Sequence, residues 1–281
     1  MSQPLQAVTE VLQAHGITPD RYDLLQDGNT LVVRLTETIV ARVVQDLTGP
    51  RATTEWFERE IALAQHLTSR GAPVIPLHFA LPAGPHLHRG YPMNFWQFVT
   101  RTDIVPEPAE IGRVLKRCHE ALADFSPELP RLGIITESIC VLDKTEGFEP
   151  KVKQMLHQKL TESLETLADL PYQPLHGDAH PGNLMQTTVG LLLTDWEDAF
   201  SGPVEWDVAS LIWNAQILDG DYEFVVALKD AYGPLNVEAL EQCLVARAAV
   251  MTAWYPTLYP HPDASRREKL QRRIDWLAGI P

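Results

Sequence analysis

The spacing of apolar residues changes several times along the first hundred positions of the chain. In residues 5–12 apolar residues recur every three or four positions, which predicts an amphipathic helix. Residues 22–44 instead carry short apolar runs separated by turn-forming polar triplets, which predicts a meander of strands. Helical spacing returns in residues 54–67, and residues 94–99 are typical of a further strand. Residues 83–90, rich in Pro, Gly and His, are expected to form a loop.

The rest of the chain is predicted to be mainly helical. Helical periodicity marks five segments, residues 111–119, 152–170, 208–218, 237–254 and 270–277. One hairpin pattern interrupts them, in which two apolar runs, residues 184–185 and 191–193, are joined by Thr187–Gly190. A strand-rich first part and a helix-rich second part predict the α+β class, with the change near residue 98.

The polar residues on either side of this hairpin are ordered as phosphoryl transfer requires. His176, Asp178 and Asn183 form an H-x-D-x-x-x-x-N pattern before it, and Asp195 follows it. A hairpin brings its ends together, so Asn183 and Asp195 are expected to be neighbours. Their oxygens suit Mg²⁺, which takes its remaining ligands from water and phosphate. Asp178 can face such a metal without binding it, which is the place for a base that accepts a hydroxyl proton.

This segment resembles the catalytic and metal-binding loops of the aminoglycoside phosphotransferase family, a branch of the protein-kinase-like fold that phosphorylates small molecules. His176–Asp178, Asn183 and Asp195–Glu197 fall on the family's pattern, and the DWE triplet stands where protein kinases have DFG. The resemblance implies that Asp178 is the catalytic base and that Asn183 and Asp195 are metal ligands. We expect His176 to brace the loop by hydrogen bonding.

The resemblance continues after the hairpin and implies the fold and the reaction. Gly202–Pro203 and Trp206–Ala209 also match, with Asp207 implied to be a structural acid that braces the catalytic loop. The implied fold has two lobes, a nucleotide-binding lobe in residues 1–98 and a helical lobe with the catalytic loop and acceptor site in residues 99–281. The implied reaction moves the γ-phosphate of ATP or GTP, with Mg²⁺ as cofactor, to a hydroxyl group of a small molecule.

The cation that contacts the nucleotide phosphates departs from the family pattern. No lysine occurs before Lys116, so the usual third-strand lysine is absent, and Arg42 occupies the matching place. Arginine keeps the charge and can grip phosphate in a fork, although it is not geometrically equivalent to lysine. Arg34 is the alternative if the strand register is shifted. Gly28 is the only glycine in the meander, so the G-x-G-x-x-G phosphate loop is also missing.

Glu60 is the expected partner of Arg42. It interrupts the apolar stripe of the helix predicted in residues 54–67, and a charge facing a core needs an opposite charge nearby. The two side chains would then form the helix-to-strand ion pair that the resemblance implies. Arg42 as an exposed arginine on an edge strand, without a nucleotide role, is the simpler alternative.

Two other interpretations of the polar set remain open at this point. His176, Asp178, His180 and Asp195 could bind a transition metal in a hydrolase, since imidazole and carboxylate suit zinc or iron. That interpretation leaves Asn183 without a role. A kinase-shaped binding protein without catalytic activity is the second alternative, and the missing lysine is its main support.

Net charge is −14 and is unevenly distributed. Residues 1–98 carry seven arginines and nine acids, while the remainder carries 16 basic and 28 acidic residues. A strongly acidic second part disfavours nucleic acid as a partner and mildly favours an amine-bearing acceptor. Taken alone, the charge is better explained by ordinary solubility.

The remaining sequence features predict a cytoplasmic protein without a membrane segment. No apolar run approaches the roughly 20 residues of a membrane span, and the first residues lack the pattern of a secretory signal. Cys118, Cys140 and Cys243 are far apart and lack metal-ligand spacing, so they are expected to be reduced thiols of the core. The sequence does not indicate an oligomeric state.

Overall fold

A computed structural model describes residues 2–48 and 53–280, which divide into two compact units. Unit 1 consists of Met1–Val105 together with Leu184–Glu197, and unit 2 of Pro106–Asn183 and Asp198–Pro281. The hairpin segment, which the sequence analysis placed with the larger lobe, thus packs within unit 1. The structure confirms the predicted α+β class.

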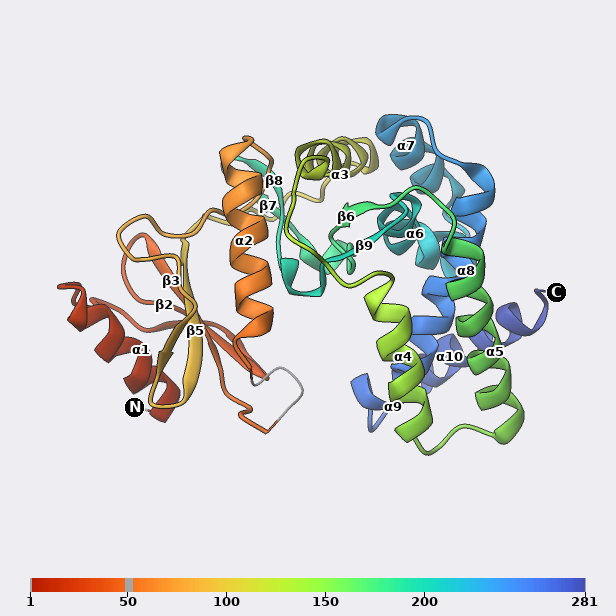
Figure 1. Ribbon diagram of the computed structural model, residues 1–281, viewed down its shortest axis with the longest axis horizontal. Helices are drawn as coiled ribbons and strands as arrows, with labels where there is room; N and C mark the ends of the chain where they lie inside the picture. The colour runs from red at the N-terminus through yellow and green to blue at the C-terminus, as the bar shows by residue number, and fades with distance from the viewer. Residues whose placement is uncertain (1, 49–52, 281) are drawn as a thin grey trace. The chain divides into compact units, whose positions relative to one another are not determined.

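Unit 1 is built on a five-stranded antiparallel sheet with strand order β1-β2-β3-β5-β4 (Figure 1). Its strands and helices are α1 (Gln3–Ala14), β1 (Asp23–Asp27), β2 (Thr30–Arg34), β3 (Ile39–Val44), α2 (Glu55–Ser69), β4 (His86–His88) and β5 (Tyr91–Gln97). The short strand β4 corrects the prediction of a loop in residues 83–90. It pairs with β5 at the edge of the sheet, where three residues suffice because only one neighbour is needed.

The two faces of this sheet have different partners because side chains alternate along each strand. Leu31, Ala41 and Phe95 belong to the core that α1 covers. Arg42 points to the opposite face, where Val44 packs against residues of α2. Figure 1 shows α1 and α2 on opposite sides of the sheet. The register of β3 therefore directs Arg42 toward α2.

The predicted hairpin is present as β7 (Leu184–Thr187) and β8 (Gly190–Leu193). Its backbone is tied to other parts of unit 1, since Leu193 N–H donates to the Pro73 carbonyl at 2.9 Å and Thr188 N–H to the Thr100 carbonyl at 3.0 Å. Leu184 pairs with Leu193 at the open end of the hairpin. Asn183 directly precedes this pair in the chain, and Asp195 follows it by two residues.

Unit 2 is mainly helical. Its helices are α3 (Pro108–Leu122), α4 (Gly133–Lys144), α5 (Pro150–Leu167), α6 (Glu205–Trp213), the π-helical η3 (Asn214–Asp219), α7 (Tyr222–Tyr232), α8 (Val237–Ala253), α9 (Tyr255–Leu258) and α10 (Ala264–Ala278). Two short strands, β6 (Gln173–Leu175) and β9 (Phe200–Gly202), pair antiparallel. The short 3₁₀ segments η1 (Pro181–Asn183) and η2 (Trp196–Asp198) flank the hairpin in sequence.

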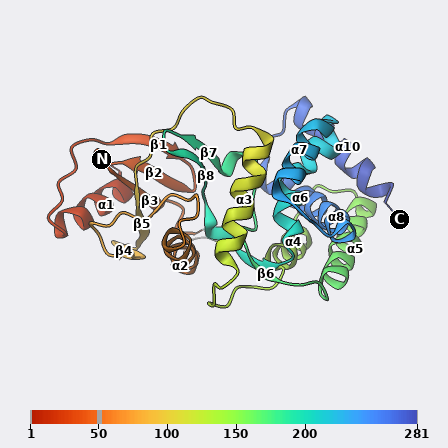
Figure 2. The same cartoon turned by 90° about the horizontal axis from the view of Figure 1, so that it is seen from above.

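Helix α8 lies at the centre of unit 2 and is buried on nearly every side. It packs against α5, α6 and α4, and its C-terminal half meets α9 and α10 (Figures 1 and 2). A helix that is apolar all round carries no single stripe, as expected for a central helix. A helix was predicted in residues 237–254 and α8 spans Val237–Ala253, but it is not the amphipathic helix that was expected.

One expectation for the cysteines is wrong. Cys118 and Cys243 are buried, but Cys140 is exposed. Helix α4 turns Ser138 and Leu142 into the core, and a residue halfway between two such positions points to the other side of a helix. In residues 2–48 and 53–280, no helix combines the length and the apolar character needed to cross a membrane.

Candidate active site

The catalytic-loop sequence folds into a tight turn that only glycine permits at its second position. Gly177 has φ +87°, and a Cβ there would lie 2.2 Å from the Asp198 carbonyl oxygen. The carbonyl of Gly177 accepts a hydrogen bond of 2.7 Å from the indole of Trp206. Both constraints fix the backbone immediately before Asp178.

Asp207 braces this turn from the first turn of α6. Its carboxylate accepts hydrogen bonds from the backbone N–H groups of His176 at 2.8 Å and Gly177 at 2.9 Å. His119 of α3 adds a third contact, Nε2 to Oδ2 at 3.0 Å, and its Nδ1 lies 2.8 Å from the Tyr232 hydroxyl. Burial opposes ionisation of Asp207, but these partners outweigh it and lower the pKa of its carboxyl.

His176 is fully buried and lies within the same turn. The backbone N–H of Asp178 donates to its Nδ1 at 3.3 Å. The imidazole thus holds the turn, as expected for a bracing residue. This contact also argues against the hydrolase alternative, and the described residues contain no group of three or more His, Cys, Asp or Glu side chains that could hold a metal ion.

Asp178 is held by an arginine that the sequence analysis did not single out. Arg247 of α8 contacts Asp178 Oδ1 through Nη2 at 2.5 Å. The guanidinium is 3% exposed, whereas the Asp178 side chain is 29% exposed. Burial raises the pKa of the Asp178 carboxyl, but Arg247 and then His180 outweigh that effect, so the pKa is lowered. Asp178 is therefore an ionised carboxylate with one oxygen engaged.

The other oxygen of Asp178 has a weaker neighbour. His180 Nε2 lies 3.5 Å from Oδ2, too far for a good hydrogen bond, while His180 Nδ1 accepts from the Gly182 N–H at 3.0 Å. Asn183, at the end of the same loop, donates from Nδ2 to the Asp178 carbonyl at 3.0 Å. That bond orients the amide, whose oxygen, Oδ1, is of the type that suits a metal.

The predicted ion pair between Arg42 and Glu60 is present in unit 1. Arg42 Nη1 lies 2.8 Å from Glu60 Oε1, and Asn94 donates to the other oxygen of Glu60 at 3.1 Å. Arg34, the alternative, instead lies over the Phe98 ring at 3.6 Å and donates to backbone carbonyls. The register assigned from the sequence was therefore correct for Arg42.

Arg42 has two further acidic neighbours. Its Nη1 lies 3.2 Å from Asp195 Oδ1, and its Nη2 donates to Glu197. Burial opposes the charge of Arg42, but Glu60, Asp195 and Glu197 outweigh it and raise the pKa of its guanidinium. For Glu60, burial and these neighbouring carboxylates outweigh Arg42 and raise the pKa to about 7.

Asp195 has an unusual backbone conformation. Its φ is +68°, a left-handed value that costs a residue other than glycine roughly 1 kcal/mol. Its Oδ1 is buried without a hydrogen bond, although Arg42 approaches it at ion-pair distance. At 3.2 Å the opposite charges attract each other, although their alignment is too poor for a hydrogen bond.

Asp195 offers a carboxylate whose chemistry would fit a hard divalent cation. Three carboxylates share one arginine, and even with Arg59, which donates to the Glu197 carbonyl at 3.2 Å, acids are in excess. Carboxylate oxygen is the donor that Mg²⁺ prefers. Asp195 belongs to unit 1 and Asp178 and Asn183 to unit 2, so their convergence on one cation stays a prediction.

Two residues of the site were missed, and each left a signal in the sequence. Arg247 is the only charged residue in Gln242–Trp254, and a lone charge in such an apolar helix requires a partner. His119 lies on the face of α3 that also carries Leu115 and Cys118. A polar residue on an apolar face indicates a buried hydrogen-bonding network.

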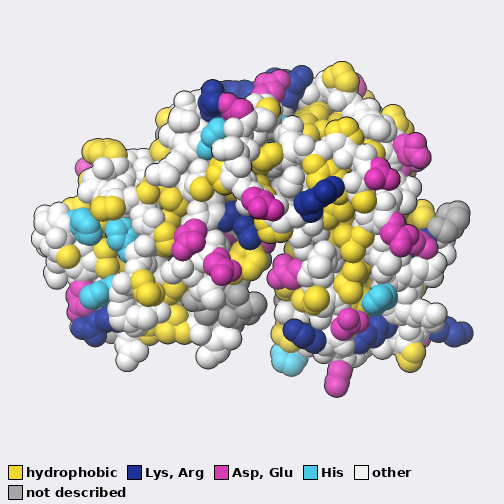
Figure 3. Space-filling view, viewed as in Figure 1, with side chains coloured by type: hydrophobic (Ala, Val, Ile, Leu, Met, Phe, Trp, Pro, Cys, Tyr) yellow, Lys and Arg dark blue, Asp and Glu magenta, His cyan; other side chains and the backbone are white. Residues whose placement is uncertain are grey.

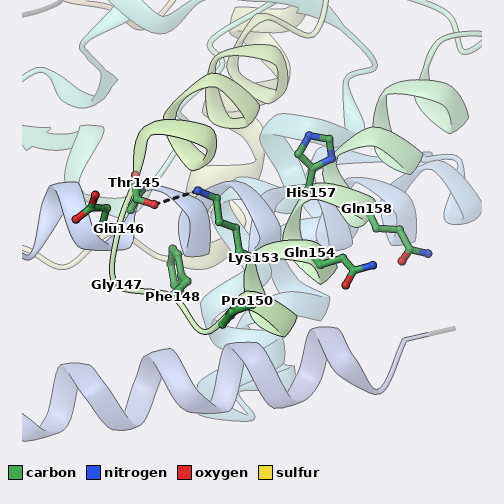
Figure 4. A pocket seen from close by; sticks show the side chains of 9 residues that line it. All are labelled: Thr145, Glu146, Gly147, Phe148, Pro150, Lys153, Gln154, His157 and Gln158. Atoms are coloured by element: carbon green, nitrogen blue, oxygen red, sulfur yellow. Dashed lines mark hydrogen bonds between the residues drawn. The ribbon is translucent and has the colours of Figure 1, made fainter.

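A surface hollow of about 710 Å³ lies at the turn between α4 and α5 in unit 2 (Figure 4). None of the predicted site residues lines it. Lys153, which points toward Thr145 in Figure 4, donates to the carbonyls of Asp143 at 3.0 Å and Thr145 at 3.2 Å. It therefore satisfies the last carbonyls of α4, and the hollow has no link to the catalytic loop.

Residues 11–243 match the family described as the phosphotransferase enzyme family. The amicoumacin kinase hAmiN, solved in complex with AMP-PNP, Ca²⁺ and Ami, aligns with a TM-score of 0.78 and 14% identity over 100% of this chain and 97% of its own. Choline kinase LicA from Streptococcus pneumoniae aligns with a TM-score of 0.69 and 14% identity over 99% and 100%. No curated protein matches the chain.

Spectinomycin phosphotransferase APH(9)-Ia, solved in complex with ADP and spectinomycin, is a third similar structure. It aligns with a TM-score of 0.63 and 15% identity, covering 97% of this chain and 92% of its own. Identities this low establish a shared fold, and the fold shared by all three is that of kinase-like phosphotransferases.

Proposed function

The chain belongs to the phosphotransferase enzyme family, and we propose that it transfers the γ-phosphoryl group of ATP or GTP to a hydroxyl group of a small molecule. The observation that carries the proposal is the state of Asp178. It is ionised, fixed through Oδ1 by Arg247, and still partly exposed to solvent. Nothing in the structure favours the inactive alternative.

Asp178 Oδ2 is the atom that we assign to the acceptor hydroxyl. The hydroxyl oxygen forms a bond to the γ-phosphorus while the bond from that phosphorus to the bridging oxygen breaks. The nucleoside diphosphate leaves with the bonding electrons, and the hydroxyl proton passes to Oδ2. Because its pKa is lowered, Asp178 orients the hydroxyl first and takes the proton late, as suits a loose transition state.

Asn183 and Asp195 are the residues that would hold Mg²⁺. A bound cation would neutralise negative charge on the phosphates. The hairpin register supports their convergence, because the paired residues Leu184 and Leu193 close the end at which both stand. Asp207 holds the loop through His176 and Gly177, so that Asp178 keeps one orientation.

Arg42 is the residue that we assign to the nucleotide phosphates, with Glu60 as its support. Its guanidinium has two nitrogens directed at carboxylates, a fork that matches phosphate oxygens equally well. With phosphate bound, Arg42 would lie between the carboxylates of its cluster and the phosphate. A cation held by Asp195 would offset this negative charge.

The test is nucleotide binding followed by turnover. Thermal melting with AMP-PNP should show stabilisation that requires Mg²⁺, and ADP should form only when a suitable hydroxyl compound is added. Stabilisation that is identical with and without Mg²⁺, or that is absent with both ATP and GTP analogues, would contradict the proposal.

The amine preference suggested by net charge stays a prediction. On the face that Figure 3 shows, acidic side chains are scattered rather than gathered into one patch. Scattered charge provides solubility without a defined site for a cationic group. The identity of the acceptor must therefore come from the side chains around Asp178.

A further inference from the structure

A buried asparagine lies in strand β5, on the face of the sheet that meets helix α2 in unit 1. Asn94 is 0% exposed and pairs across the sheet with Arg42 of β3. Its neighbours along the strand, Met93 and Phe95, are apolar and belong to the core on the other face. Asparagine is disfavoured in strands and its amide is costly to bury, so packing alone does not account for it.

Both ends of the Asn94 amide are engaged. Trp96, two residues along β5, donates from its indole Nε1 to Asn94 Oδ1 at 2.8 Å, and Asn94 Nδ2 donates to Glu60 Oε2 at 3.1 Å. An indole N–H can only donate, so it requires the oxygen end of the amide. The NH₂ end of Asn94 is thereby directed at Glu60.

Asn94 limits the way in which Glu60 can pair with Arg42. Glu60 Oε1 accepts from Arg42 Nη1 at 2.8 Å, whereas Oε2 is occupied by Asn94. Arginine and a carboxylate often pair through two parallel hydrogen bonds, one from each terminal nitrogen. Here Glu60 takes only one, and the second nitrogen of Arg42, Nη2, donates to Glu197 instead.

The two terminal nitrogens of Arg42 have partners of different accessibility. The Glu60 side chain is 3% exposed, whereas that of Glu197 is 21% exposed. An ion pair with a more exposed partner contributes less, so the contact with Glu197 is the easier one to replace. Nη2 is therefore the nitrogen that an incoming phosphate oxygen can take over.

We propose that Asn94 is a positioning residue for nucleotide binding, which occupies Glu60 Oε2 and so keeps Arg42 Nη2 available for the nucleotide phosphates. The proposal rests on the proposed function, which assigns Arg42 to the phosphates. Glu197 holds Nη2 in the nucleotide-free protein and yields it to phosphate. Without Asn94, Glu60 would bind both terminal nitrogens of Arg42, and phosphate would have to break a buried pair of two hydrogen bonds.

An arginine at this position needs such a restriction more than a lysine would. A lysine ammonium is a compact charge with three donors, which a glutamate and a phosphate can approach from different sides. A guanidinium presents a planar fork that one carboxylate can occupy completely. Asn94 prevents that occupation and thus lets Arg42 serve both Glu60 and a nucleotide.

The first experiment replaces Asn94 by leucine, which has a similar volume and no hydrogen-bond donor. Calorimetric titration with AMP-PNP, or with GMP-PNP, and Mg²⁺ is carried out at pH 8, above the Glu60 pKa of about 7, so that Glu60 is ionised. Asn94→Leu should raise Kd for the nucleotide at least about tenfold, the loss of one charge-assisted pair. An unchanged Kd would overturn the proposal.

A double-mutant cycle shows whether Asn94 acts through Glu60. Glu60→Gln removes the carboxylate that would otherwise occupy both nitrogens of Arg42. In that background Asn94→Leu should change Kd by less than about twofold, because the two substitutions remove the same effect. A tenfold loss that persists without the Glu60 carboxylate would show that Asn94 acts independently of it and would overturn the proposal.

His78→Leu is the matched control for the loss of a buried polar side chain. His78 is 5% exposed and lies in the same unit, but its ring lies 3.1 Å from Thr38 Oγ1 and accepts from the Ala80 N–H at 3.2 Å. It should leave Kd within about twofold of the unmodified protein. Equal losses in His78→Leu and Asn94→Leu would show a general destabilisation of unit 1 and overturn the inference.

A crystal structure of Asn94→Leu gives a result that does not depend on nucleotide. It should show Glu60 bonded to both terminal nitrogens of Arg42, with Glu197 released from Nη2. A single bond between Glu60 and Arg42 in the variant would overturn the inference, even if nucleotide binding were weakened.

The outcomes separate this inference from the proposed function. Nucleotide binding that Asn94→Leu leaves unchanged would refute the role of Asn94 and keep the proposed function. A two-bonded pair in the variant, together with no nucleotide binding by the unmodified protein, would refute both the proposed function and the phosphate role of Arg42, while the restriction of Glu60 by Asn94 would stand.

Discussion

Two buried charge clusters lie in this chain, one in each unit, and their imbalances are opposite. Around Arg42 in unit 1, three carboxylates share the guanidinium. Around Asp178 in unit 2, the buried guanidinium of Arg247 contacts the carboxylate, and the His180 imidazole lies 3.5 Å from it. The first cluster has more acidic than basic side chains, and the second has more basic than acidic ones.

The difference teaches that neither cluster is arranged for stability alone. Buried charges are normally paired one to one, since each unpaired charge costs several kcal/mol. The acids around Arg42 are compatible with the proposed Mg²⁺ at Asp195, whereas Arg247 and His180 keep the single carboxylate of Asp178 in its ionised form.

The largest effect is expected from neutralising the Asp178 carboxylate in unit 2. Asp178→Asn should lower turnover by about 10²–10⁴-fold, the usual contribution of a general base. Nucleotide affinity, measured by titration with AMP-PNP and Mg²⁺, should stay within a few-fold. Turnover that falls less than tenfold would remove Asp178 from the role of base.

The cluster around Arg42 is tested by neutralising two of its carboxylates, one at a time. Asp195→Asn should weaken Mg²⁺-dependent nucleotide binding at least about 100-fold, since even residues that only support metal ligands contribute 10–100-fold. Glu197→Gln removes the same charge without removing a predicted ligand. If both variants weaken binding equally in calorimetric titration, Asp195 acts through charge and not as a ligand.

Arg247 is expected to affect the reaction because it holds the Asp178 carboxylate in place. Arg247→Met should reduce kcat roughly 10–100-fold, because an unsupported Asp178 samples other orientations. Nucleotide affinity should be unchanged, and the exposed control Arg266→Met should behave as the unmodified protein. Steady-state kinetics with each substrate varied in turn separates an effect on kcat from an effect on nucleotide affinity. A drop in nucleotide affinity without a change in kcat would contradict a positioning role.

The smallest expected effect is on the pH dependence of the free energy of unfolding, and it comes from Glu60 in the cluster around Arg42. Folding raises the pKa of Glu60 from 4.5 to about 7, so the protonated form is favoured in the folded state. This contribution is complete below pH 4.5 and is lost as pH rises through about 7. It amounts to roughly 3 kcal/mol, because the pKa rises from 4.5 to about 7 and each unit of pKa corresponds to 1.36 kcal/mol.

Glu60→Gln should abolish that part of the pH dependence. Urea unfolding between pH 4.5 and 8 should show a falling free energy of unfolding for the unmodified protein and a flatter curve for the variant. Glu58→Gln, on the exposed side of the same helix, is the control. Parallel curves for the unmodified protein and Glu60→Gln would contradict a raised pKa.

Much of the fold could be predicted because its signals are local. The alternation of β2 and β3 and the helical spacing of α2 gave Arg42 and Glu60 as partners before any contact was known. Helices α4 and α7 were not predicted individually, because apolar residues such as Cys140 and Val226 also lie on their exposed sides and no single apolar stripe stands out. Strand β4 was not predicted because it has only three residues. The π-helical η3 extends α6 where regular helix spacing was expected.

The sequence by itself determined the order of the catalytic groups, the hairpin between them and the ion pair of Arg42, since each depends on residues close in sequence or on strand alternation. Only the tertiary structure decided that Arg247, 69 residues from Asp178, holds that base. Charge balance in a core depends on which helices meet, and local periodicity carries no information about that.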